Sequence, residues 1–136
     1  MSPARSPLDL VRALYGALES GALSEALAAE LFTDDARTVE RPNVLKPMGA
    51  VASRAVMAAN AKKGAAILAS QRYEVHQAIE SADTVAVRLT WTGVMAVDAG
   101  PLRSGQVLKA HVAQFFSVRD GRLATIETYD CYEPLA

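Results

Sequence analysis

Residues that could do acid–base chemistry gather near the C-terminal end of the chain. Side chains alternate along a strand, so one face of this segment carries Ile126, Thr128, Asp130 and Tyr132. This face begins apolar and ends in a carboxylate beside a phenol. Burial among apolar neighbours raises the pKa of a carboxyl group and suits it to proton transfer. We therefore predict that Asp130 is the acid–base group of a ligand pocket; the alternative is a solvated strand end or an ion pair with an arginine.

Other polar and aromatic residues are candidates for the same pocket. Gln114 lies on an apolar strand face, and a buried amide needs a partner, which could be Asp130, a ligand or water. Tyr15 could donate a hydrogen bond to a ligand carbonyl, although a core tyrosine whose hydroxyl reaches the surface is the alternative. Tyr132 carries the same two interpretations. We expect Trp91 and Phe116 to be walls of the pocket.

Composition sets the class of protein. The chain has 136 residues, enough for one domain spanning 1–136, and its net charge of −1 comes without any block of like charge. That balance argues against binding to nucleic acid or to an anionic membrane. A lone Cys131 and the absence of a signal peptide or a long apolar run predict a cytoplasmic protein. We find no metal-ligand spacing and no phosphate-binding loop, so we expect no cofactor and no metal.

Three helices are predicted to come first. Apolar residues three and four apart indicate a helix over residues 8–20, with Ser6 and Pro7 at its start and Gly21 at its end. A second helix is expected over residues 23–31. A third is expected over residues 51–63, with Gly64 as its C-cap and with Val51, Ala55, Val56 and Ala59 facing inward.

Strands are predicted to follow. A short strand is expected over residues 36–40, between the second and third helices. From Ser70 the period of the apolar residues changes to two, and one strand face is formed by Tyr73, Val75, Gln77 and Ile79. A long strand is expected over residues 84–98, with Gly93 marking a bulge or bend. The Asp-Gly turn within residues 119–122 then joins the two longest strands into a hairpin. This order predicts an α+β fold with helices on one face of a curved sheet.

Three short motifs carry a resemblance to a known family. These are FTDDA at residues 32–36, DGRL at residues 120–123 and the Tyr-Asp pair at residues 129–130. Over roughly residues 8–134 the chain resembles the nuclear transport factor 2-like superfamily, in its SnoaL-like polyketide cyclase and ketosteroid isomerase branch. The resemblance implies a cone: a curved mixed or antiparallel sheet wrapped around three N-terminal helices, also described as a cystatin-like α+β barrel. It also implies a deep apolar pocket and a homodimer formed through the outer sheet face.

The isomerase site carries over only in part. The residue that resembles the isomerases' general base, just before a proline, is Arg41, which stays protonated at neutral pH and cannot abstract a proton. Glu40 could replace it only if the one extra residue in this stretch turns it inward. Tyr15 matches the oxyanion tyrosine, whereas the second oxyanion group falls near Ala113. By the same resemblance Arg41 and Asn43 stand at the pocket mouth, where Arg41 could bind a carboxylate or enolate oxygen; a surface ion pair with an aspartate is the alternative.

The acid–base pair of the cyclases does not carry over. Their acid–base positions on the last two strands fall on Gln114 and Thr128, and Asp130 lies two residues further along the same face. His111 is expected on the opposite, dimer-forming face, and it becomes a base candidate only if the strand parity slips.

Two classes of function follow from these residues. The leading hypothesis is a homodimeric protein that binds a small, largely apolar organic molecule in the cone. As an enzyme it would catalyse proton transfer next to a carbonyl, of the isomerase or cyclase type, with Asp130 as acid–base and with Tyr15 and Gln114 steadying the oxyanion. The alternatives are a non-catalytic ligand-binding or dimerisation module and a cofactor-free epoxide hydrolase.

Overall fold

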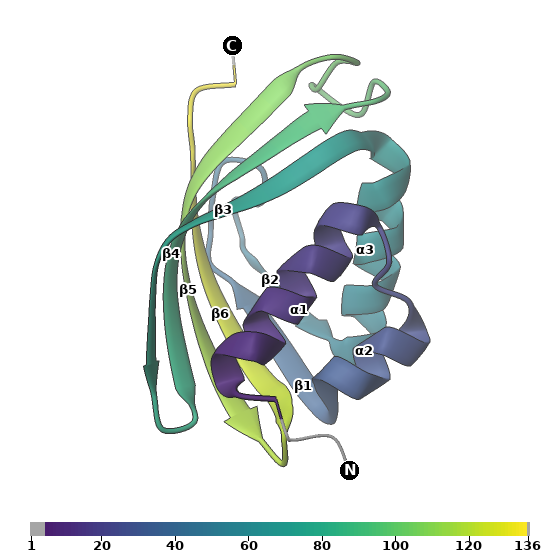
Figure 1. Cartoon of the computed structure of the whole chain (residues 1–136). Helices are drawn as coiled ribbons and strands as arrows, with labels where there is room; N and C mark the ends of the chain where they lie inside the picture. Colours follow the sequence, from purple (N-terminus) through teal and green to yellow (C-terminus); the bar gives the residue numbers. More distant parts are fainter. Residues whose placement is uncertain (1–4, 136) are drawn as a thin grey trace.

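The protein, seen in a computed structural model that describes residues 5–135, consists of three helices and one six-stranded sheet. The helices are α1 (Pro7–Ser20), α2 (Glu25–Leu31) and α3 (Arg54–Ile67). The strands are β1 (Phe32–Glu40), β2 (Ala50–Ser53), β3 (Leu68–Ser81), β4 (Thr84–Met95), β5 (Val107–Arg119) and β6 (Arg122–Tyr132). Figure 1 shows the helices together on one side of a strongly curved sheet. The predicted α+β cone is confirmed.

The sheet is mixed and open. Its order is β2-β1-β6-β5-β4-β3, in which β1 and β6 run parallel and all other neighbours run antiparallel. Strands β2 and β3 form the two edges, so the sheet does not close on itself. The parallel pairing brings the ends of β1 and β6 together, because Glu40 pairs with Thr128. Two segments far apart in the sequence therefore contribute to one region of the concave face.

The first two helices begin and end as local chemistry dictates. The Ser6 side chain accepts a hydrogen bond from the Asp9 N–H, and Gly21 adopts a left-handed conformation whose N–H bonds the carbonyls of Ala17 and Leu18. Helix α1 therefore matches its prediction to within one residue. Helix α2 begins at Glu25, two positions later than predicted, because Ser24 is its N-cap.

The third helix differs from its prediction. Residues 50–53 form strand β2, which pairs antiparallel with β1, and α3 begins only after Ser53, whose hydroxyl caps the Val56 N–H. The helix then continues through Gly64 to Ile67, so Gly64 is not its C-cap. Because the true start lies later, the inward face also differs: Val51 and Val56 are 60% and 45% exposed, Ala55 and Ala59 are exposed, and Ala58 is the buried residue.

Bulges occur where the sequence did not indicate them. The β3–β4 pairing shifts between Val75 and Gln77, so Ala78 packs inward and Ile79, predicted on the face of Tyr73, is 56% exposed. Of the bulge or bend predicted at Gly93, a bulge toward β5 is not found, since β4 pairs with β5 without a shift along its length. Gly93 instead makes room for an aromatic ring, because a Cβ there would lie 2.4 Å from Cη2 of Trp91. Strand β4 also ends at Met95 rather than at residue 98.

The core lies between α1 and the concave face of the sheet. Leu10, Val11 and Leu14 of α1 are buried in one cluster with Leu89 and Phe116 of the sheet. Each such side chain contributes roughly 1.5–3 kcal/mol on burial. Within residues 5–135 no helix has the length and apolar character needed to cross a membrane.

Candidate functional site

Two adjoining cavities lie on the concave side of the sheet. The apolar cavity has a volume of about 270 Å³, and its lining includes Leu14, Leu18, Phe32, Met57 and Ile126. The polar cavity has a volume of about 200 Å³ and is lined by Gln71, Tyr73, Trp91, Ala110, Val112, Gln114, Asp130 and Tyr132. Three residues, Gln71, Tyr73 and Gln114, line both cavities and so form the partition between them.

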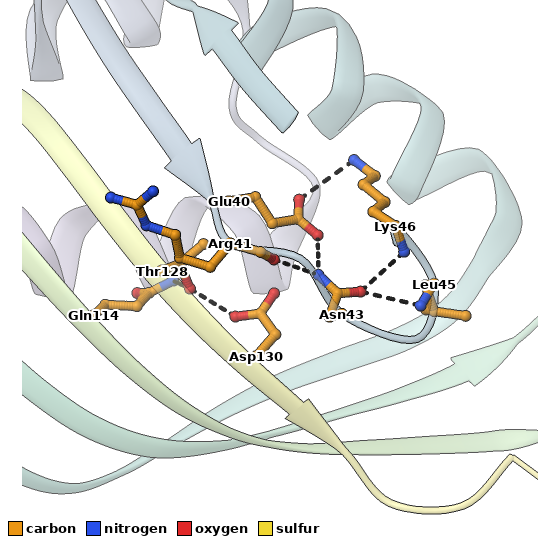
Figure 2. A network of polar contacts seen from close by, with 8 residues as sticks. All are labelled: Glu40, Arg41, Asn43, Leu45, Lys46, Gln114, Thr128 and Asp130. Atoms are coloured by element: carbon orange, nitrogen blue, oxygen red, sulfur yellow. Dashed lines mark hydrogen bonds and ion pairs between the residues drawn. The ribbon is translucent and has the colours of Figure 1, made fainter. Parts of the chain in front are cut away.

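A chain of hydrogen bonds crosses this region from α1 to β6. The Tyr15 hydroxyl donates to Oε1 of Gln114 at 2.6 Å, and Nε2 of Gln114 donates to Oγ1 of Thr128 at 3.0 Å. The Thr128 hydroxyl in turn donates to Oδ1 of Asp130 at 2.6 Å. Figure 2 shows the second half of this chain, which we name the Tyr15–Asp130 relay. It brings together the three residues predicted as catalytic, with Thr128 as the link between them.

An ionised Asp130 fixes the direction of every bond in the relay. A carboxylate can only accept, so the single Thr128 hydroxyl proton points to Asp130. Thr128 must then accept from the amide nitrogen of Gln114, which turns the amide oxygen toward Tyr15. Tyr15 must therefore be protonated and donating. One N–H of Gln114 and one oxygen of Asp130 remain outside the relay.

Burial dominates the electrostatics of both ends. It raises the pKa of the Asp130 carboxyl, and the charge of Glu40 raises that pKa further, while the Thr128 hydrogen bond and Lys46 oppose the shift. Burial likewise raises the pKa of Tyr15, with the adjacent Tyr73 adding to the shift. The rings of Tyr15 and Tyr73 stack with centroids 4.8 Å apart. Asp130 is therefore a stronger base than a solvated aspartate, and Tyr15 stays a donor at neutral pH.

Glu40 faces inward and lines the apolar cavity. The β1–β6 pairing shifts between Phe32 and Arg37, and this irregularity aligns Glu40 with Thr128 on the concave face. Glu40 therefore has the inward orientation that a replacement for Arg41 as base would require. Glu40 is held by Lys46, at 3.3 Å, and by the Asn43 side-chain amide, at 2.8 Å (Figure 2). Glu40 therefore already has a cationic partner within ion-pair distance.

The structure places Arg41 away from both cavities. It follows Glu40 directly and so points to the opposite face, where its guanidinium pairs with Glu127 at the surface. Arg41 lines neither cavity, and its ion-pair partner is a glutamate rather than the aspartate of the alternative. Asn43 braces the loop after β1, since its side chain also accepts from the N–H groups of Leu45 and Lys46 at 3.0 Å. Asn43 supports Glu40 and is not among the cavity-lining residues.

The remaining candidates divide between wall and core. Trp91 and Tyr132 line the polar cavity, with their rings edge to face at 6.4 Å. Phe116 is buried beneath Tyr15 and lines neither cavity, so it supports the site from the core. Thr128 is buried and acts through the relay. His111 lies on the outer face, as the alternation along its strand predicted. Its ring pairs there with Glu133.

Sequence reasoning overlooked two of the three residues of the partition, Gln71 and Tyr73. Gln71 is held by two bonds, donating to the Leu18 carbonyl and accepting from the Trp91 indole N–H, both at 3.0 Å. Tyr73 was assigned to a strand face but not to a site. The only signal available was a polar amide two residues from a tyrosine at the start of an alternating strand, and its meaning depends on β4 lying alongside.

Comparisons with known proteins agree on the fold. IdmH from Streptomyces antibioticus, whose proposed activity is that of a polyketide cyclase, is 23% identical, with 93% of this chain and 92% of that chain covered and a TM-score of 0.75. A protein of Acidithiobacillus ferrooxidans with the same proposed activity is 15% identical, with coverages of 96% and 91% and a TM-score of 0.73. A Catenulispora acidiphila protein described as having a ketosteroid isomerase-like fold, solved with trimethylamine, is 18% identical, with coverages of 90% and 85% and a TM-score of 0.69.

The family assignment comes from the sequence itself. Among curated proteins, none matches this chain. A family profile described as the SnoaL-like domain matches residues 11–126, which is most of the chain and includes strands β1 to β5 and the first part of β6. The protein therefore belongs to the SnoaL-like domain family of the nuclear transport factor 2-like superfamily.

Proposed function

We propose that this protein binds a small, largely apolar organic molecule across the two cavities and catalyses cofactor-free proton transfer next to a carbonyl group. Isomerisation and aldol-type cyclisation are the reactions of this type. One observation carries the proposal: a half-buried carboxylate with a raised pKa, Asp130, lines a cavity that adjoins an apolar one. Such a carboxylate is a competent general base near neutral pH.

Each member of the relay has a distinct role in this proposal. Asp130 takes the proton with the oxygen that Thr128 leaves free. Gln114 directs its second N–H to the developing oxyanion, because its first is committed to Thr128. Tyr15 is a positioning residue, since its only proton is donated to Gln114 and holds that amide in its orientation.

Deuterium exchange tests the proposed chemistry. An enolisable ketone such as 2-tetralone, whose fused ring is apolar, should exchange its α-hydrogens in D₂O faster with the protein than without it. Asp130→Asn should lower that rate by roughly 10²–10⁴-fold, the range for loss of a general base. Glu127→Gln, on the outer face of the same strand, is the matched control and should leave the rate unchanged.

The same experiment separates the enzyme from the non-catalytic alternative. If the ketone raises the melting temperature of wild-type protein without any catalysed exchange, the protein is a binding module. An Asp130→Asn variant that exchanges at the wild-type rate would remove Asp130 from the mechanism.

We also propose that the protein is a homodimer through the outer face of the sheet. Phe115 and Tyr129 pack edge to face there at 6.0 Å and are 45% and 42% exposed, and Phe115 lies in one cross-strand row with Ala86 and the exposed Ile79. Phe115→Lys should convert the dimer to monomer in sedimentation at micromolar concentration. Val44→Lys, at an equally apolar exposed position in the loop after β1, should not. A wild-type monomer would contradict the proposal.

A further inference from the structure

Two phenol groups of the polar cavity are not used by the relay. Tyr73 from β3 and Tyr132 from β6 both line this cavity together with Asp130. Neither hydroxyl has a hydrogen-bond partner within residues 5–135, and over the same residues no fully buried side-chain polar atom is left unpaired. Neither hydroxyl is therefore fully buried, and both residues line the polar cavity. A ligand in this cavity can supply the acceptor that each phenol lacks.

The charges around the two phenols keep them protonated. Burial raises the pKa of Tyr73, and the charges of Asp130 and Glu19 add to the shift. Burial also raises the pKa of Tyr132, again with contributions from Asp130 and Glu40. Every carboxylate that acts on these two phenols raises their pKa. At neutral pH each hydroxyl is a donor, and an electron-rich oxygen is the ligand group that it fits.

We propose that Tyr73 and Tyr132 act with Gln114 in binding the oxyanion, and that this pair of phenols holds the carbonyl oxygen of an enolisable ketone within reach of Asp130. The free oxygen of Asp130 removes a hydrogen from the carbon next to the carbonyl, and an O–H bond forms as the C–H bond breaks. The C–H electron pair becomes a C=C bond, and the carbonyl π pair moves to the oxygen, where the two phenols stabilise the charge. Asp130 later returns the proton to carbon. This inference rests on the proposed function and names its substrate class.

The shape of the polar cavity supports a flat, unsaturated head group. The Trp91 ring forms one wall, held by its N–H bond to Gln71 and seated over Gly93, where a Cβ would collide with it. A volume of about 200 Å³ admits a ring bearing a ketone. The apolar remainder of the molecule would extend past the partition into the apolar cavity. The substrate class is therefore a cyclic ketone joined to an apolar body.

The experiment uses 2-tetralone as the enolisable ketone and 2-naphthol as a stable imitation of its enol. Deuterium exchange followed by NMR reports proton transfer, and calorimetric titration with 2-naphthol reports recognition of the enol oxygen. Tyr73→Phe and Tyr132→Phe each remove one hydroxyl and keep the ring. Tyr129→Phe, on the opposite face of β6, is the matched control. Tyr73→Phe retains the ring that stacks on Tyr15, and should this variant nevertheless fail to fold, Tyr132→Phe decides alone.

Each phenol variant should lower the exchange rate on the order of 10²-fold, as loss of one oxyanion donor does. Each should also weaken 2-naphthol binding by about tenfold, the equivalent of one hydrogen bond. Tyr129→Phe should change neither quantity. Asp130→Asn should lose exchange but keep 2-naphthol affinity, because it removes the base and leaves both donors.

The outcomes separate this inference from the proposed function. If both phenol variants keep wild-type exchange and affinity while Asp130→Asn loses exchange, the oxyanion pair is wrong and the proposed function stands. If Asp130→Asn keeps wild-type exchange, the proposed function fails, and the inference fails with it. Failure of 2-naphthol to bind the wild-type protein would also overturn the inference.

Discussion

Strands β5 and β6 present the same kinds of side chain on both faces of the sheet, yet these side chains differ in burial and in bonding partners between the two faces. Phe116 faces inward and is 1% exposed, whereas its neighbour Phe115 faces outward and is 45% exposed. Asp130 on the inner face accepts a bond at the end of a directed relay, whereas Glu127 on the outer face pairs with Arg41 at the surface. The proposed chemistry belongs to the inner face, where burial leaves polar groups dependent on one another.

The largest expected contrast is in stability. Phe116→Ala should lower the free energy of unfolding by about 3–5 kcal/mol, because it opens a cavity beneath Tyr15 in the closed core. Phe115→Ala should cost about 1 kcal/mol, the scale of its edge-to-face contact with Tyr129. Urea denaturation of both variants measures the difference. Similar losses for the two would mean that the outer face is as closed as the inner one.

A smaller contrast is expected between two threonines of β6. Thr128→Val keeps the shape but leaves the Gln114 amide without its acceptor, which should cost about 1–3 kcal/mol. Thr125→Val, whose exposed hydroxyl bonds Ser117, should stay within about 0.5 kcal/mol of wild type.

The relay adds a second readout to this pair. Removing the Thr128 hydroxyl also removes the bond that lowers the pKa of Asp130, so that pKa should rise further in Thr128→Val. Carboxyl ¹³C NMR titration measures the shift. An unchanged Asp130 titration in this variant would show that the relay does not reach the carboxylate.

The alternation of side chains along β6 made their inward or outward orientation predictable from the sequence. Strand β6 pairs regularly from Thr125 to Tyr132, so period two correctly assigned Asp130 and Tyr132 inward and Tyr129 outward. The hairpin turn and the caps of α1 are local signals in the same sense, because each depends on only a few adjacent residues.

Other orientations and one strand depended on strand pairing and register shifts, which the sequence does not show. Which of Glu40 and Arg41 faces inward is decided by the shift in β1–β6 pairing, and the fate of Ile79 is decided by the shift in β3–β4 pairing. The sequence predicts a helix from residue 51, within what is strand β2. Four residues in an alanine-rich stretch are too few to show a strand periodicity, and they form a strand only because β1 lies beside them. The partition at Gln71 likewise exists only once β3 lies against β4 and α1.

The smallest contrast is in the pH dependence of stability, and it has opposite signs on the two faces. Burial raises the pKa of Asp130 above its unfolded value of about 3.9, so folded protein favours the neutral acid, and ionisation destabilises the fold as pH rises through that window. The Arg41 hydrogen bond lowers the pKa of Glu127, so that pair stabilises the fold above the unfolded value of about 4.3, and this stabilisation is lost as pH falls. Asp130→Asn should therefore be more stable than wild type at pH 7, and Glu127→Gln less stable. Both differences should shrink toward pH 3 in denaturation series, and a common sign for the two variants at pH 7 would contradict the assignment of one carboxylate to a buried site and the other to a surface ion pair.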